Sequence, residues 1–99
     1  MTRHVVWSPQ AVADWEQILH YIAVEQERPL VAERLAVDLR AACQPYAAAP
    51  EIGQAEPRLP QPCRRFTFKR WVVLYQPHAD GIAVLRVVDA ARDFDRLFG

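Results

Sequence analysis

Apolar residues in the first half of the chain recur at intervals of three and four, which places them on one face of an α-helix. The first such set is Val12, Trp15, Ile18, Leu19, Ile22 and Ala23. Ser8 and Pro9 stand before it, and a serine cap followed by a proline in the first helical position is a common helix start. The pattern predicts a helix from Pro9 to about Gln26.

A second apolar set with near-helical spacing follows Pro29, and its members are Val31, Leu35, Leu39, Ala42 and Tyr46. We expect this helix to start without a good cap, because Arg28 is a poor one. Pro45 is expected to kink or end the helix, since proline lacks the N–H that continues the hydrogen-bond ladder. The short connection between the helices predicts an antiparallel hairpin, packed on itself or jointly onto a sheet. Arg34 and Asp38, four positions apart, are candidates for an ion pair.

The remaining pattern alternates or runs apolar over short stretches, which indicates β-strands. The predicted strands are residues 3–7, 64–68, 71–75 and 82–88. The first needs a pairing partner from elsewhere in the fold, whereas short connections join the other three into an antiparallel meander. Prolines and a glycine between residues 50 and 62 predict an irregular linking loop. Residues 90–98 are amphipathic, and we expect them to dock on the sheet as one or two helical turns.

An N-terminal strand, an α-helical hairpin, a three-stranded antiparallel meander and a short C-terminal helix predict an α+β fold of two layers. The 99 residues form one domain, 1–99. A chain of this length buries roughly 65% of its unfolded surface, which leaves its stability marginal and favours an oligomer or a tight partner. No stretch approaches the ~18 uncharged apolar residues of a membrane span, and the N-terminus lacks a signal-peptide core, so we expect a cytoplasmic protein without membrane association.

The 12 basic and 12 acidic residues give a formal net charge of zero, which argues against a generally basic nucleic-acid binder. The charges are nevertheless segregated. Residues 1–51 hold four basic and seven acidic side chains, and residues 52–99 hold eight and five. Five basic and no acidic residues lie between Arg58 and Arg70, interleaved with aromatic rings. This pattern suits a phosphate-tracking or base-stacking surface, an acidic amphipathic protein partner, or simply the charged outer face of a sheet.

The sequence shows no motif for a metal, a cofactor or a hydrolase nucleophile. Cys43 and Cys63 are isolated, and the histidines are scattered, so neither a disulfide nor a zinc site is indicated. His78 with Asp89, Asp93 and Asp95 could suggest an acid cluster near a metal. Asp93 and Asp95 are better explained by the favourable dipole at the start of a helical turn. There is no glycine-rich phosphate loop and no G-x-S-x-G sequence.

Several short motifs follow one another along almost the whole chain. They are Ser8-Pro9 with Ala11 and Asp14 to Ile22, Pro29 with Ala32 and Arg34, Pro50-Glu51-Ile52-Gly53, Arg65-Phe66, Trp71-Val72-Val73-Leu74-Tyr75, and Arg86-Val87-Val88 with Arg92-Asp93. In order and spacing they resemble the ParE branch of the ParE/RelE toxin family, the toxins of plasmid-stabilisation modules. The resemblance implies the toxin of a type II toxin-antitoxin module, neutralised by a ParD-like antitoxin whose chain wraps the helical hairpin and the sheet.

The two branches of this family imply different chemistry. ParE-like members are associated with poisoning DNA gyrase, and RelE-like members with cutting mRNA in the ribosome, which needs acid–base groups and cations. By resemblance, the groups for cleavage would fall at Arg65, Thr67, Val72, Arg92 and Phe98, where only the two arginines are cationic and Phe98 lacks a hydroxyl for proton transfer. We therefore expect a non-enzymatic inhibitor that binds gyrase. The alternatives are a degenerate ribosome-dependent mRNA endonuclease that uses Arg65 and Arg92, and a detoxified or purely structural partner module.

The residues expected to bind the target or the antitoxin form a basic face with two apolar anchors. They are Arg64, Arg65, Lys69, Arg70, Trp71, Arg86 and Arg92, with Phe94 and Phe98 as the anchors. Arg86 stands in a strand that is apolar on both faces, so it must lie at an edge, pair with a buried acid or face a groove. Asp89 and Ala90 replace the His and Gly of many relatives, so a role of that His does not carry over. A homodimer and a hetero-oligomer both remain open.

Overall fold

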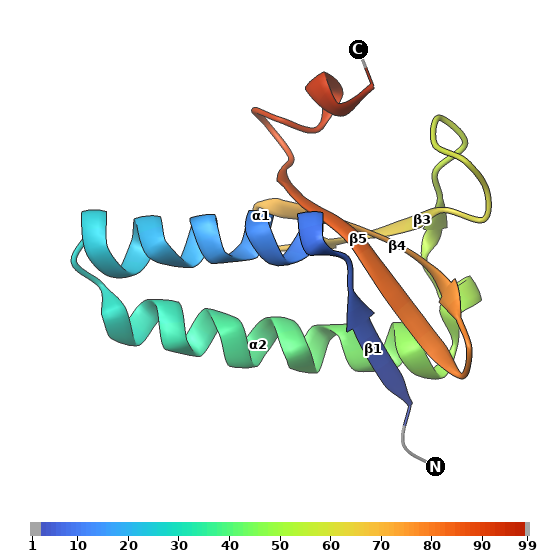
Figure 1. Cartoon of the computed structure of the whole chain (residues 1–99), viewed down its shortest axis with the longest axis horizontal. Helices are drawn as coiled ribbons and strands as arrows, with labels where there is room; N and C mark the ends of the chain where they lie inside the picture. The colour runs from blue at the N-terminus through green and yellow to red at the C-terminus, as the bar shows by residue number, and fades with distance from the viewer. Residues whose placement is uncertain (1–2, 99) are drawn as a thin grey trace.

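The computed structural model describes residues 3–98, which fold into a five-stranded sheet with a helical hairpin on one face (Figure 1). The elements in chain order are β1 (His4–Trp7), α1 (Pro9–His20), a π-helical turn (Tyr21–Glu25), α2 (Pro29–Ala48), a 3₁₀ turn (Pro50–Ile52), β2 (Gln54–Ala55), β3 (Arg64–Phe68), β4 (Trp71–His78), β5 (Gly81–Asp89) and a second 3₁₀ turn (Asp95–Leu97). The predicted α+β class, hairpin and meander are confirmed. None of the helices described is long and apolar enough to cross a membrane.

The strands lie in the order β1-β5-β4-β3-β2, with β3, β4 and β5 as the antiparallel meander. β1 finds its partner in β5, the last strand, and runs parallel to it with Val5 opposite Ile82 and Trp7 opposite Val84. This pairing places the first strand of the chain beside the last one (Figure 1). Because β1 stops at Trp7, the second half of β5 has no strand at its outer edge, and α1 lies along it instead.

Ser8 explains why α1 begins where the sequence predicts. Its hydroxyl accepts a hydrogen bond from the Ala11 N–H at 3.0 Å and donates one to the Leu85 carbonyl at 2.8 Å. One side chain therefore caps the helix and fastens it to β5. The predicted helix continues to Glu25, but its last five residues, Tyr21–Glu25, form a π-helical turn that the apolar spacing did not indicate.

The expected end of the helix at Pro45 is wrong, because α2 continues through this residue to Ala48. Proline removes one N–H near the end of the helix, which is a small loss beside the contacts that follow it. The Pro45 carbonyl still accepts from the Ala49 N–H at 3.0 Å, the Tyr46 ring stacks on Phe66 with centroids 4.0 Å apart, and Ala47 is buried. As expected, the first turn has no side-chain cap from Arg28.

The region 50–62, predicted as irregular, contains a 3₁₀ turn and the short strand β2, so that prediction is wrong in part. The Tyr75 hydroxyl donates to the Pro50 carbonyl at 2.6 Å and lies against Gly53, where any side chain would collide with the tyrosine ring. These contacts bring Gln54–Ala55 beside Arg64 and Arg65, and neither residue of β2 is a proline, so both can join the sheet.

The predicted strands leave residues 76–81 as the connection between the last two strands, and the connection in the structure is shorter. Residues 76–78 extend β4, and only Ala79 and Asp80 remain as the turn, with Ala79 in the left-handed region at φ 48°. Pro77 is tolerated because β3 pairs with β4 only as far as Tyr75, so no N–H of residue 77 is needed on that side.

Both faces of the central strands are covered, which explains their nearly continuous apolar sequence. Trp71, Val73 and Tyr75 of β4 pack under the helices, whereas Val72 and Leu74 point to the other face. There they meet Phe94 of the C-terminal tail (residues 90–98), which docks on the sheet as predicted. The tail is wound into turns rather than into an α-helix.

Candidate functional site

Two acidic side chains are buried in the part of the chain that the structure describes, Glu56 with 2% and Asp89 with 8% of its surface exposed. A buried carboxylate is costly unless arginines and N–H groups compensate its charge. Both carboxylates have such partners. Asp89 contacts the C-terminal tail directly, and Glu56 is connected to it through Arg58. The candidate site is therefore built around them.

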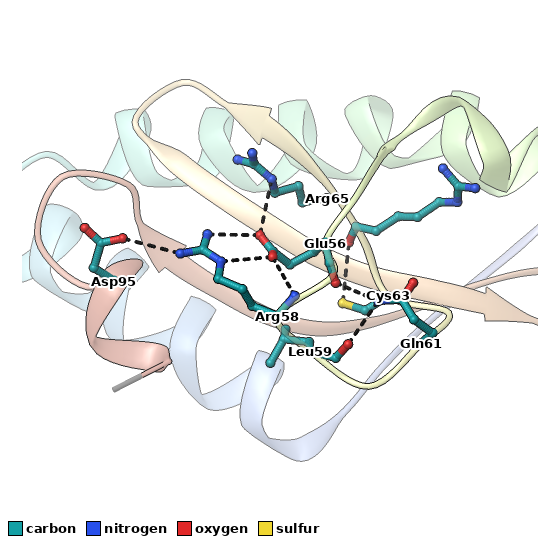
Figure 2. Close-up of polar contacts among 8 residues, drawn as sticks. Glu56, Arg58, Leu59, Gln61, Cys63, Arg65 and Asp95 are labelled. Atoms are coloured by element: carbon teal, nitrogen blue, oxygen red, sulfur yellow. Dashed lines mark hydrogen bonds and ion pairs between the residues drawn. The ribbon is translucent and has the colours of Figure 1, made fainter.

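Glu56 is held by two arginines (Figure 2). The backbone N–H, Nε and Nη2 of Arg58 each donate to its carboxylate at 3.1 Å, and the Nε of Arg65 lies 3.5 Å from Oε1. The Arg58 hydrogen bonds outweigh the effect of burial and lower the pKa of Glu56, and the same bonds raise the pKa of Arg58. Glu56 is consequently ionised at neutral pH.

Arg58 connects Glu56 to the tail. Its guanidinium lies 3.9 Å from the centroid of the Phe98 ring and 5.0 Å from that of Phe94, and its Nη1 is 3.8 Å from Asp95. The Arg65 guanidinium lies 5.3 Å from the centroid of the Phe94 ring. A cation over an aromatic face adds attraction to the burial of the ring, so the buried carboxylate fixes both rings through its arginines.

The loop that carries Glu56 is itself held by backbone contacts. The Glu56 N–H donates to the Cys63 carbonyl at 2.9 Å, and the Gln61 side-chain amide donates to the carbonyls of Glu56 at 2.7 Å and Leu59 at 3.0 Å (Figure 2). Burial, and then the nearby Glu56 charge, raise the pKa of the Cys63 thiol, which keeps it protonated. Cys63 is thus a core residue here and not a nucleophile.

Asp89 organises the start of the tail. Its Oδ1 accepts hydrogen bonds from the N–H groups of Ala91 and Arg92, each at 2.9 Å. Its Oδ2 accepts one from Arg70 Nε at 2.8 Å and forms an ion pair with Arg70 Nη2 at 2.7 Å. Its carbonyl accepts the N–H groups of Asp93 and Phe94. Burial raises the pKa of Asp89, but the N–H of Arg92, the Arg70 side chain and the N–H of Ala91 outweigh it, and the net pKa is lowered.

Arg86 pairs with an acid from a distant element. Its Nε and Nη2 donate to the Asp14 carboxylate of α1 at 2.7 and 3.0 Å, and the same carboxylate accepts the Val87 N–H at 3.0 Å. The side chain lies at the free edge of β5, pairs with an acid and lines a groove, so all three possibilities from the sequence hold. The hydrogen bond to Asp14 raises the pKa of Arg86.

Two grooves flank these residues. The first has a volume of about 710 Å³, lies between α1, the end of β5 and the tail, and is lined by Tyr21, Arg70, Arg86, Arg92 and Arg96 among others. The second has a volume of about 560 Å³ and lies between the start of α2 and the β3–β4 turn. Its walls are mostly apolar, with Leu30, Val31, Leu35 and Trp71, and its basic residues are Arg34, Lys69 and Arg70.

The residues of the expected basic face lie at different sites in the structure. Arg70, Arg86 and Arg92 meet at the first groove. Arg65 joins Glu56 instead, and Arg64 donates to the carbonyls of Gly53 at 2.7 Å and Glu51 at 3.2 Å on the edge strand side.

The remaining expected residues are partly core residues. Trp71 and Phe94 are buried, with 7% and 9% of their surface exposed, and Phe98 is half-buried. Lys69 is exposed in the β3–β4 turn, where it adopts φ 52°, and its amine lies 5.7 Å from the Phe68 ring centroid. The structure therefore does not assemble the nine residues into one surface.

The amino-acid sequence of this fold matches the model of a known family. The family model described as "ParE toxin of type II toxin-antitoxin system, parDE" matches residues 5–94. The chain belongs to the ParE toxin family. The resemblance inferred from the motifs is thereby confirmed.

A solved ParE-related structure has the same fold. A chain from the "Chromosomal ParDE TA system from P. aeruginosa" superposes with a TM-score of 0.67, covering 88% of this chain and 95% of that chain, at 20% sequence identity. At this identity the likeness shows the fold alone. No curated protein sequence gives a significant match to this ParE-family chain.

Sequence reasoning missed Glu56 in this ParE-family chain. The residue stands in a proline-rich loop, and only its two basic neighbours in the sequence segment, Arg58 and Arg65, could have suggested a paired acid. It likewise missed Asp14 as the partner of Arg86, because 72 positions separate them. Within residues 3–98, no group of three or more His, Cys, Asp or Glu side chains is arranged to hold a metal ion.

Proposed function

We propose that this ParE-family toxin acts by binding DNA gyrase, without cutting a nucleic acid, and that a ParD-like antitoxin neutralises it in the cytoplasm. The observation that carries the proposal is the state of Arg65. A cation for RNA cleavage must be free to meet the developing phosphorane charge, whereas this guanidinium faces the buried Glu56 carboxylate and lies beside the Phe94 ring.

The other positions for cleavage support the same conclusion. Val72 is buried with 3% exposure and has no group that transfers a proton, and Thr67 replaces a cation with a neutral hydroxyl. The Phe98 ring, which lacks a hydroxyl, lies under the Arg58 guanidinium. Of the two cationic positions, Arg92 alone is exposed and outside the ion pairs described above. One cation is a weak basis for phosphoryl chemistry, since each missing group typically costs 10²-fold or more.

The first groove is the surface we assign to the target. Arg92 is exposed at its rim, and Arg70 and Arg86 are fixed beside it by Asp89 and Asp14. Fixed guanidiniums suit protein recognition, because less side-chain freedom is lost when they bind a partner. We assign an apolar contact to Phe98, which follows the groove-lining Leu97 at the end of the tail.

The second groove and the outer face of the hairpin suit the antitoxin. Several large apolar side chains are exposed along the hairpin, namely Val12, Tyr21, Val24, Leu30, Val31 and Val37, with Leu30 at 76%. Leu30 and Val31 also line the second groove with Leu35 and Trp71, and an apolar surface of this kind usually marks a partner site. Lys69 and Arg70 at the groove favour a partner segment with apolar side chains and flanking acids, so we propose a hetero-oligomer with the antitoxin.

The decisive experiment is a supercoiling assay with purified gyrase and the toxin in stoichiometric excess. Inhibited supercoiling or a trapped cleavage complex, relieved by the antitoxin encoded beside the toxin, is expected. Unchanged supercoiling would refute gyrase as the target. In parallel, primer-extension mapping of transcripts after induction should show no new in-frame 5′ ends; their appearance, with loss in Arg92→Ala, would establish the mRNA endonuclease instead. A host without the antitoxin that grows normally would indicate a detoxified module.

A further inference from the structure

We propose that Glu56 and Asp89 are positioning residues that hold the C-terminal tail in the single arrangement that presents Arg92 and Phe98 to the target. The inference rests on the proposed function, because it names what fixes the target surface. Neither carboxylate belongs to the basic face itself.

The tail has little else to hold it. It contains one short 3₁₀ turn, and Phe94 is its only residue with less than a tenth of its surface exposed among residues 90–98. Side chains of Leu97 and Phe98 pack only partly against the sheet. Few apolar contacts and short-range hydrogen bonds are the features of a segment that opens locally.

Asp89 determines the direction in which the tail leaves β5. Its Oδ1 accepts the N–H of Arg92 itself, and its Oδ2 is held by Arg70 from the β3–β4 turn. The backbone of Arg92 is therefore tied to the end of β5, and the guanidinium projects from a fixed point. Loss of the negative charge breaks the ion pair with Arg70 and removes the charge that strengthens the hydrogen bonds from the N–H groups of Ala91 and Arg92.

Glu56 acts at the far end of the tail through Arg58. The two carboxylate oxygens bind the Arg58 side chain, and Arg58 Nη1 faces Asp95 (Figure 2). The plane of the guanidinium is left to lie against Phe98. Arg58 alone is 47% exposed and would have many rotamers. Its position over the ring thus depends on the buried acid.

Buried ion pairs are suited to this role. They add little net stability compared with apolar residues of the same shape, and their better supported use is to select one arrangement over others. Here the two buried acids in the described chain sit at the two ends of one tail. The helix-covered core contains no buried acid among these residues, so it should not depend on them.

The test compares Glu56→Gln and Asp89→Asn with the matched control Asp80→Asn. Each change removes one negative charge, but Asp80 is exposed in the β4–β5 turn, at the other end of the strand pair from Asp89. Hydrogen exchange followed by mass spectrometry reports the tail and α2 separately. We expect exchange in residues 90–98 to be at least about tenfold faster in the two variants, with α2 unchanged. Asp80→Asn should match the wild type.

Gyrase inhibition is measured at a temperature where every variant is folded. Glu56→Gln and Asp89→Asn should need about tenfold more toxin for half-inhibition, since a released tail spends most of its time in other positions. Arg92→Ala should lose inhibition with normal tail exchange, which separates contact from positioning. If Glu56→Gln does not fold, Arg58→Lys replaces it, because lysine keeps the charge but lacks the planar guanidinium that binds both carboxylate oxygens of Glu56 and lies flat against Phe98.

The outcomes separate this inference from the proposed function. Unchanged tail exchange in Glu56→Gln and Arg58→Lys would overturn the positioning role whatever the target is. A released tail with unchanged gyrase inhibition would overturn it as well, and so would equally faster exchange in the tail and α2. If wild-type toxin does not inhibit gyrase, the proposed target fails, and the exchange data alone then decide whether the carboxylates fix the tail.

Discussion

The two faces of the sheet are covered in different ways. Under the helices, sixteen buried residues from the hairpin and the strands form one cluster. On the opposite face five buried residues, Cys63, Val72, Leu74, Val88 and Phe94, form a smaller one, and the cover is completed by arginines paired with buried acids.

We expect the helix-covered face to stabilise the fold and the tail-covered face to control the order of the C-terminal tail. Apolar burial is non-directional and insensitive to pH, so the helix-covered face can carry the fold. The tail-covered face relies on charged hydrogen bonds, which are directional and lost on protonation. The proposed target surface at the C-terminal tail can therefore change its order without unfolding the domain. The following predictions test this division, from the largest effect to the smallest.

Leu39→Ala should weaken the helix-covered face most. Leu39 is fully buried in α2, and removing its side chain should lower the free energy of unfolding by about 2–5 kcal/mol. Chemical denaturation followed by circular dichroism measures the loss. Leu30→Ala, at a position 76% exposed on the same helix, is the control and should change it by less than about 0.5 kcal/mol. Equal losses would show that α2 does not form the core.

Phe94→Ala should have a smaller effect that is confined to the tail. The ring is almost as buried as a core residue, but the tail can open while the rest stays folded, so we expect a loss of about 1–3 kcal/mol. Hydrogen exchange should be faster in residues 90–98 than in α2. A loss as large as that of Leu39→Ala, spread over both regions, would remove the distinction between the faces.

Acid should open the tail before the hairpin. The pKa values of Glu56 and Asp89 are lowered in the folded protein, so the stabilisation by these groups is complete above the unfolded values of about 4.3 and 3.9 and disappears as pH falls through the folded values. Amide NMR signals of the tail should shift or broaden below about pH 4 while those of α2 persist. Glu56→Gln should remove the Glu56 share of this change; simultaneous loss of both sets of signals would contradict the prediction.

Arg34→Ala should have the smallest effect. Arg34 and Asp38 form the ion pair expected from their spacing, with Nε 3.1 Å from Oδ1, but the arginine is 78% exposed. Such a pair contributes about 0.2–0.5 kcal/mol, less at high salt. Denaturation at low and high salt measures it. A loss above 1 kcal/mol would mean that this face of α2 is more buried than the structure has it.

The sequence alone determined the elements whose signals are local. The Ser8-Pro9 cap, the apolar spacing of both helices and the alternation in residues 64–68 act within a few positions, so the helices and the meander could be predicted. Order and spacing of short motifs also sufficed for the ParE family. Errors occurred at Pro45 and in the loop at 50–62, where distant packing on Phe66 and Tyr75 outweighs the local preference of proline.

Only the tertiary structure decided which charges meet. The pairing of Arg86 with Asp14 and of Arg65 with Glu56 depends on which strands are neighbours and on where a loop returns to the sheet. A side chain in a sequence carries its charge but not its distance from other charges, and Coulomb attraction and desolvation depend on that distance and on burial. The basic stretch before Trp71 was therefore visible in the sequence, whereas its division into paired and exposed arginines was not.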